Sequence, residues 1–116
     1  MRRKKNRGEY LKYKETARTL AENRIAHYNA LYGFNVNRIS IKNTKSRWGS
    51  ASKKGNLNFH YKIALIPQDL ADYIVVHELC HLGELNHSAQ FWNLVERAVP
   101  DYRVARKRVM GISLQS

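Results

Sequence analysis

The chain has 116 residues and a net charge of +12, and its length fits one domain. Its 43% apolar and 26% charged residues are ordinary globular usage, which excludes an intrinsically disordered chain. The longest apolar run, residues 63–66, is far shorter than the roughly 20 residues that cross a bilayer, so we expect no membrane partner. No apolar segment follows the basic start, as it would in a secretory signal, and the single Cys80 cannot form an internal disulfide. We therefore expect a cytoplasmic protein.

The first part of the chain predicts a basic tail, a long helix and a strand. Residues 1–8 are strongly basic and are expected to be a flexible tail, which leaves residues 9–116 as a single domain. Apolar residues recur at three-to-four spacing over residues 9–31, which predicts a long amphipathic helix that Gly33 ends. The β-branched residues of segment 36–42 then predict a strand.

Two further segments complete the predicted sheet. An extended segment is expected over residues 57–65, after the turn-forming run 52–56. Residues 46–50 precede that turn and could pair with the extended segment as a hairpin. We therefore expect a small antiparallel sheet.

The second half of the chain predicts three helices. Proline and acidic residues at its start predict a helix over residues 67–82, and Gly83 permits its end. Ser88 is a good N-cap for a helix over residues 89–99. A last basic helix is expected through residue 109, with Asp101 as its N-cap. The fold class is therefore α+β. The helix over residues 67–82 contains the sequence HExxH, which is typical of a zincin-type active-site helix, and two C-terminal helices follow it.

The helix expected over residues 67–82 carries the motif HExxH. His77 and His81 lie four residues apart, so both imidazoles project from one face, about 6 Å apart along the axis, and can reach one metal ion. Glu78 is rotated about 100° from His77, near enough to hydrogen-bond a water on the metal. Because most of this helix is apolar, uncompensated histidines would be costly to bury. The motif predicts one zinc ion per chain with Glu78 as catalytic base, and the alternative is two hydrogen-bonded core histidines.

A catalytic zinc usually takes three protein ligands, and His87 is the leading candidate for the third. A continuing helix would carry His87 about 9 Å beyond the motif, so the chain must turn back, and Gly83 and Asn86 are residue types that allow it. The spacing matches the metzincin pattern HExxHxxGxxH, except that Glu84 stands where the pattern has glycine. Glu84, or Glu96 on the next helix as in gluzincins, is the alternative third ligand.

Five blocks of sequence stand in an order and spacing that point to one family. They are Arg47-Trp48-Gly49-Ser50, the segment Asp72 to Leu82, Asn86-His87-Ser88, Phe91-Trp92 and Pro100-Asp101-Tyr102. Over about residues 38–110 the chain resembles the YgjP-like metallopeptidase-domain family, which is related to SprT-like zinc proteins. The resemblance implies that His77, His81 and His87 are zinc ligands and that Glu78 is the catalytic carboxylate. Many members carry a cysteine where this chain has Ala51, and many are longer at the N-terminus, so the chain looks like a minimal version.

Residues beyond the metal ligands have candidate roles too. Arg47 could bind a substrate carboxylate or phosphate, or stabilise charge in the transition state. The alternative is structural, with Trp48 in the core and Arg47 solvated. Donors of a hydrogen bond to an oxyanion could be His60, Tyr61 or Tyr102, among which the sequence does not choose.

Three functions compete at this point. A zinc metallopeptidase acting on a peptide or protein is the leading hypothesis, and a metal-dependent hydrolase of nucleotide phosphoanhydrides is the first alternative. Residues 1–62 hold 16 Lys or Arg and 3 Asp or Glu, whereas residues 63–116 hold 5 and 6. The basic N-terminal half could therefore bind nucleic acid or another polyanion, as a non-enzymatic module with structural zinc. A structural site is normally closed by four ligands, however, and three are evident here.

Overall fold

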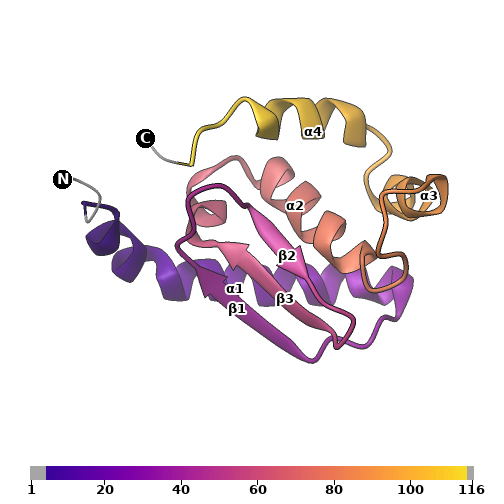
Figure 1. Cartoon of the computed structure of the whole chain (residues 1–116), viewed down its shortest axis with the longest axis horizontal. Helices are drawn as coiled ribbons and strands as arrows, with labels where there is room; N and C mark the ends of the chain where they lie inside the picture. The colour runs from indigo at the N-terminus through magenta and orange to yellow at the C-terminus, as the bar shows by residue number, and fades with distance from the viewer. Residues whose placement is uncertain (1–4, 115–116) are drawn as a thin grey trace.

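The computed structural model describes residues 5–114, which form a long helix, a three-stranded sheet and three shorter α-helices (Figure 1). The elements in chain order are α1 (Lys5–Tyr32), β1 (Arg38–Lys42), β2 (Gly49–Ala51), β3 (Asn56–His60), the 3-10 helix η1 (Tyr61–Leu65), α2 (Gln68–Cys80), α3 (Ala89–Ala98) and α4 (Tyr102–Met110). The predicted α+β class is confirmed. Within the described range, no helix combines the length and apolar character needed to cross a membrane.

The long helix α1 begins earlier than the sequence analysis expected. It starts at Lys5, so residues 5–8, which were assigned to a flexible tail, belong to the helix, and residues 1–4 lie outside the described part of the chain. Gly33 ends α1 as predicted. Its φ of 74° is a left-handed conformation that glycine adopts without steric cost, and its N–H donates to the carbonyl of Asn29 at 2.7 Å.

The sheet is mixed, with the strand order β1-β3-β2. The predicted hairpin is present, since β2 and β3 are antiparallel, with Gly49 opposite Phe59. β1 pairs with β3 in parallel, however, with Arg38 opposite Asn56, so the expectation of an antiparallel sheet is wrong for this pair. The physical reason is the route of the chain, which crosses to the far edge of β3 after β1 and only then enters β2.

The extended segment expected over residues 57–65 is shorter than predicted. It ends at His60, and residues 61–65 form η1 instead. The side chain of His60 caps this 3-10 helix, because its Nδ1 accepts a hydrogen bond from the backbone N–H of Lys62 at 3.0 Å. The sequence pattern of apolar residues continues through Ile63, which is why periodicity alone did not show the change of conformation.

The core lies between the sheet and the two helices α1 and α2. In Figure 1, α1 crosses behind the sheet and α2 runs beside β2, and both helices contact strands. Leu57 and Phe59, alternate residues of β3, are completely buried, and so are Ala17 and Ala21 of α1. Small alanines allow the long helix to approach the core closely.

An ion pair fixes the first half of α2 to α1. Arg24 donates two hydrogen bonds to the carboxylate of Asp72, at 2.8 and 2.9 Å, and the hydroxyl of Tyr28 donates a third at 3.0 Å. The hydrogen bond to Asp72 is the main reason that the pKa of Arg24 is raised. The carboxylate is therefore held by donors of the chain itself.

The helix boundaries near the site have local causes. Ser88 caps α3 as predicted, its hydroxyl accepting from the N–H of Phe91 at 3.3 Å. Asp101 occupies the N-cap position of α4, but its side chain forms no capping hydrogen bond, contrary to expectation. Gly83 does not adopt a positive φ. A Cβ there would lie 2.7 Å from the ring of Phe34, so glycine is required at this position for close packing.

Candidate metal centre

Three histidine side chains converge at the C-terminal end of α2. His77 lies in the helix, His81 is its C-cap residue, and His87 lies in the loop before α3. The Nε2 atom of His87 is 3.1 Å from Nε2 of His77 and 3.1 Å from Nε2 of His81. Nitrogen ligands on a tetrahedral zinc with bonds of 2.0–2.1 Å lie about 3.3 Å apart. The three ring nitrogens therefore have the spacing needed to hold one metal ion.

Hydrogen bonds to the other ring nitrogens orient two of these imidazoles. His81 Nδ1 lies 3.0 Å from the carbonyl oxygen of Glu84, and His77 Nδ1 lies 3.3 Å from Oε2 of Glu78. A carbonyl or carboxylate oxygen can only accept, so in each pair the Nδ1–H donates. The lone pair of each histidine is then on Nε2, toward the cluster, which is how metal-binding histidines are normally prepared.

Aromatic side chains of α3 form the wall behind the cluster. Phe91 is completely buried, and its ring centroid lies 4.4 to 5.1 Å from the rings of His77, His81 and His87. Trp92 stacks on His77 and His87 at 5.9 and 5.7 Å. This apolar surround excludes water from one side of the imidazoles and restricts their rotamers, which favours a preorganised site.

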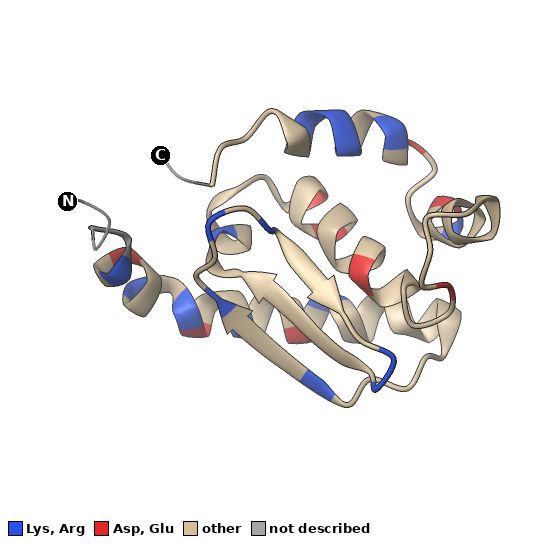
Figure 2. Cartoon of the chain, viewed as in Figure 1, with Lys and Arg blue, Asp and Glu red and all other residues tan. Residues whose placement is uncertain are grey.

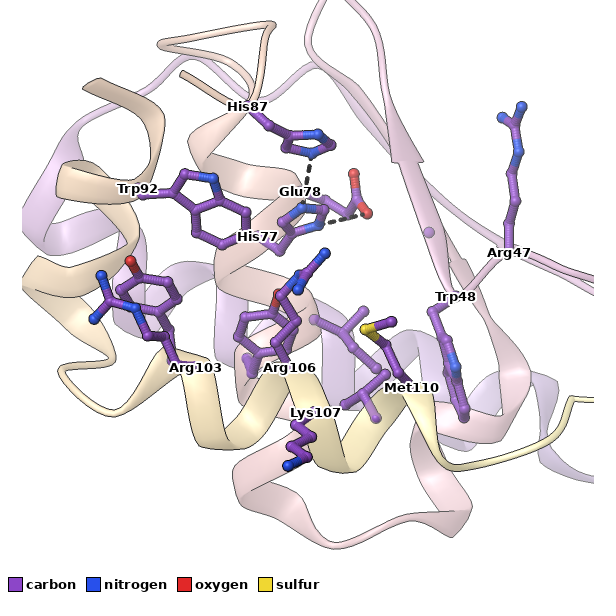
Figure 3. Close-up of a pocket in the computed structure, with 15 residues that line it drawn as sticks. Arg47, Trp48, His77, Glu78, His87, Trp92, Arg103, Arg106, Lys107 and Met110 are labelled. Carbon is purple, nitrogen blue, oxygen red and sulfur yellow. Dashed lines mark hydrogen bonds and ion pairs between the residues drawn. The ribbon is translucent and has the colours of Figure 1, made fainter. Parts of the chain in front are cut away.

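Glu78 lies beside the cluster under the edge strand β2. Its residue is only 5% exposed, and its carboxylate reaches His77 but is not one of the three converging ligands (Figure 3). A Cβ on Gly49 would lie 2.8 Å from Cγ and 3.0 Å from Oε2 of Glu78. The absence of a side chain at Gly49 therefore makes the room that the carboxylate occupies.

Burial shifts the pKa of two groups near the centre. The pKa of His87 is lowered, first by burial and then by the neighbouring His77 and His81, which favours the neutral imidazole that binds metal. Burial raises the pKa of the Cys80 thiol to about 11. Cys80 is completely buried and is not part of the converging group, so it packs in the core and does not join the three histidines.

A cleft opens beside the three histidines. Its volume is about 970 Å³, and it lies between α2, the start of β2 and the last helix α4 (Figure 3). The lining residues are Arg47, Trp48, Gly49, Tyr73, Ile74, His77, Glu78, His87, Trp92, Tyr102, Arg103, Arg106, Lys107, Val109 and Met110. A second hollow of about 310 Å³ lies on the side of His81 and Leu85, along β2. A chain-like substrate could therefore extend past the histidines in both directions.

The alternative ligands proposed from the sequence lie elsewhere. Neither Glu84 nor Glu96 joins the group of converging side chains found among the described residues. Glu84 instead contributes its backbone carbonyl to His81. Arg47 lies at the rim of the cleft, and its exposed side chain extends away from His77 in Figure 3. Trp48 is half-buried against the core and also lines the cleft, so it contributes both to packing and to the wall of the cleft.

Of the three oxyanion candidates, two are engaged elsewhere. His60 uses Nδ1 to accept from Lys62, and its Nε2 lies 3.0 Å from the carbonyl of Thr44. The hydroxyl of Tyr61 donates to Glu9. Tyr102 lines the cleft beside Trp92. Tyr73, which the sequence analysis did not single out, also lines it, and burial raises the pKa of its phenol to about 12, so its proton stays available for donation.

The basic wall of the cleft was missed from the sequence. Arg103, Arg106 and Lys107 line the cleft from α4, in the half of the chain that has almost no net charge. They do not stand out in the net charge of residues 63–116, because the acidic residues of that half balance them. Their spacing of three and four residues places them on one helix face, and this is the signal that could have found them.

Comparisons with known proteins point to a metallopeptidase family. The sequence model of the YgjP-like metallopeptidase domain matches residues 3–110. No curated protein sequence matches the chain. Among solved structures, the metallopeptidase zymogen of Pyrococcus abyssi abylysin is similar, with a TM-score of 0.71 and 25% sequence identity over 78% of this chain and 91% of that one.

Proposed function

Because the chain belongs to the YgjP-like metallopeptidase-domain family, whose name implies a metal-dependent peptidase, we propose that it is a zinc-dependent peptidase. One observation carries the proposal: three histidine Nε2 atoms converge at the spacing of ligands on a single ion. We assign His77, His81 and His87 as the ligands of one zinc ion per chain. Three imidazoles leave a fourth position free, as catalytic zinc requires.

Glu78 is the proposed catalytic base. When bound, zinc would lower the pKa of a coordinated water to roughly 7 and polarise the carbonyl of the scissile peptide bond. Glu78 is close to the ligands without joining them, so it can accept the proton of the attacking water and deliver it to the leaving amine. Its burial against Gly49 keeps the carboxylate in one place.

The remaining side chains of the cleft supply orientation. Tyr73 and Tyr102 are the phenols in the cleft wall that could donate a hydrogen bond to the developing oxyanion. Arg47, at the rim of the cleft, is a candidate for binding the substrate at a distance from the three histidines. The cytoplasmic location expected from the sequence stays a prediction.

The test separates zinc binding from turnover. Glu78→Gln removes the base but none of the three ligands, so zinc content and fold should be retained while hydrolysis of a casein-type substrate falls at least about 100-fold. Zinc content is measured by mass spectrometry of the metal in the same preparation. Unchanged hydrolysis in Glu78→Gln would overturn the assignment of Glu78.

The basic residues that α4 contributes to the cleft favour a second candidate function. Arg103 and Arg106 would suit a phosphate as well as a carboxylate, so a nucleotide phosphoanhydride hydrolase is the alternative. Nucleoside triphosphates belong in the same assay as casein, with Glu78→Gln as the blank for both. Binding of DNA that is indifferent to Glu78, without hydrolysis of either substrate, would instead support a nucleic-acid-binding module with structural zinc.

A further inference from the structure

The cleft beside the metal centre has one wall of cationic side chains. Helix α4 contributes Arg103 and Arg106 to this wall, and Figure 2 shows the run of basic residues along the helix. In Figure 3, Arg106 extends from α4 toward His77 and Glu78. Both arginines are exposed to the cleft, so their guanidinium groups can meet a ligand.

Neither arginine has an acidic partner in the described part of the chain. The ion pair that α4 does form there belongs to Arg108, which binds Asp69 of α2 at 2.8 Å. Arg103 and Arg106 lie instead over aromatic rings, 4.8 Å from the ring of Tyr102 and 5.8 Å from the ring of Trp92. An aromatic face orients a guanidinium but leaves its N–H edge free to bind an anion.

The aromatic rings connect this wall to the histidines. Trp92 stacks on Tyr102 at 4.9 Å with an interplanar angle of 14°, and it also stacks on His77 and His87. The path from the guanidinium of Arg106 to the ring of His87 consists of two such steps, 5.8 and 5.7 Å long. An extended peptide advances about 3.3 Å per residue, so Arg106 lies within about four residues of a bond cleaved at the metal centre.

We propose that Arg106, supported by Arg103, is a specificity-determining residue that selects peptides carrying a carboxylate within about four residues of the scissile bond. This inference rests on the proposed peptidase function and adds a substrate class to it. A planar guanidinium binds a carboxylate through two parallel hydrogen bonds, and the apolar rings below it limit competition from water. Two sources of the carboxylate are chemically equivalent here: an aspartate or glutamate side chain, and the free C-terminus of a short peptide.

The experiment compares peptides that differ only in this carboxylate. A quenched fluorescent peptide with an amidated C-terminus is made with glutamine throughout, and then with one glutamate at each position in turn on either side of the scissile bond. A further peptide has glutamine throughout and a free C-terminus. We expect kcat/KM of the wild type to rise about tenfold for glutamate at one position, as for one charge-assisted hydrogen bond. A rise only for the free C-terminus would identify the terminal carboxylate as the source.

The variant Arg106→Gln should abolish this preference, so that the ratio of kcat/KM for the glutamate peptide to kcat/KM for the all-glutamine peptide falls from about ten to about one. The matched control is Arg108→Gln, which removes the same charge from the same helix at a residue that does not line the cleft. It should keep the preference. Because the cleft is open, the preference should also weaken with added salt.

Binding is measured as well, so that the inference and the proposed function fail separately. Zinc-loaded Glu78→Gln protein is titrated with labelled forms of the same peptides and followed by fluorescence anisotropy, with and without Arg106→Gln. Preferential binding of the glutamate peptide that depends on Arg106 supports the inference even if no peptide is cleaved, in which case the peptidase function is overturned. Equal binding and equal cleavage of all the peptides by the wild type, or a preference retained in Arg106→Gln, would overturn the inference.

Discussion

The two ends of helix α2 hold their polar side chains in different ways. Near its N-terminal end, Asp72 accepts hydrogen bonds from Arg24 and Tyr28, so the chain itself satisfies both carboxylate oxygens. At its C-terminal end, the Nε2 lone pairs of His77 and His81 both face Nε2 of His87, and a single N–H on that nitrogen could satisfy only one of them. The first arrangement is complete without a ligand, whereas the second calls for a cation.

We therefore infer that the N-terminal end of α2 serves the fold and that its C-terminal end serves the proposed metal site. A rigid element held firmly at one end can present ligands at the other end in a fixed geometry. The Asp72 ion pair thus anchors the N-terminal part of α2 to α1, apart from the three converging histidines. We therefore expect substitutions at the C-terminal end of α2 to change zinc affinity and substitutions near its N-terminal end to change the free energy of unfolding.

Loss of a proposed metal ligand should have the largest effect, which should be a fall in zinc affinity at the C-terminal end of α2. His77→Ala and His81→Ala should each lower zinc affinity by at least about a thousandfold, since each removes one of three ligands from a site whose total binding free energy is on the order of 10 kcal/mol. Competition with a zinc-binding dye measures this. The control is His60→Ala, which removes a buried histidine with backbone partners and should destabilise the fold without changing zinc affinity.

Hydrogen exchange can locate the same effect along the helix. Chelation of the metal should accelerate amide exchange at residues 78–92 and leave residues 70–76 protected, because only the former depend on the ion. Equal acceleration over both ranges would show that the two ends are not independent.

A methyl group at Gly49 should impair catalysis next. In Gly49→Ala the new Cβ would meet Glu78 Cγ at 2.8 Å and the backbone oxygen of Asn58 at 2.9 Å, so the strand or the carboxylate must move. A shift of about 1 Å can cost about 100-fold in turnover, and we expect a loss of that order with zinc content unchanged. Gly8→Ala is the control, since a Cβ at Gly8 contacts nothing within 4 Å. Full activity in Gly49→Ala would contradict the assigned position of Glu78.

Breaking the ion pair at the other end should lower stability and spare the zinc site. Asp72→Asn leaves Arg24 partly buried without its anion, and we expect a loss of about 2 kcal/mol in the free energy of unfolding. Urea titration of the zinc-loaded protein measures it. Asp69→Asn, which breaks the exposed pair with Arg108, should cost less than about 0.5 kcal/mol. A similar loss in both variants would show that the pair with Arg24 has no special role.

The smallest effect concerns Cys80 and the dependence of stability on pH. Burial raises the pKa of Cys80 to about 11, whereas the pKa of a cysteine thiol in the unfolded chain is about 8.5. The unfolded state therefore releases its proton first, so the stabilisation is complete below about pH 8.5 and is lost as the pH rises toward 11. Urea midpoints at pH 8 and pH 10 should fall less in Cys80→Ala than in the wild type. An identical slope would contradict the shift, and zinc content should be the same in both.

Local chemistry explains what the sequence predicted well. A left-handed glycine ends α1 at Gly33 and a serine hydroxyl begins α3 at Ser88, and both depend only on residues close by in the chain. The proximity of His77 and His81 follows from the period of the helix. Bringing in His87 required only a turn, to which Gly83 contributes by packing closely against Phe34 and not by a positive φ.

Long-range pairing explains what the sequence did not predict. The parallel pairing of β1 with β3 is decided by the crossing of the chain between residues 42 and 49, which no local pattern records. Arg24 and Asp72 meet although they are 48 residues apart. The basic wall of α4 lies in the half of the sequence that has little net charge, so only the folded chain shows it beside the three histidines.

X-ray absorption at the zinc edge of the loaded wild type tests the central claim most directly. We expect three imidazole nitrogens at 2.0–2.1 Å and one oxygen, with no sulfur, at one zinc ion per chain. In His87→Ala the imidazole count should fall to two, whereas Glu96→Ala and Glu84→Ala should leave the spectrum unchanged. A spectrum with two imidazoles and a carboxylate that changes in Glu96→Ala, or with a sulfur at about 2.3 Å, would contradict the three-histidine site.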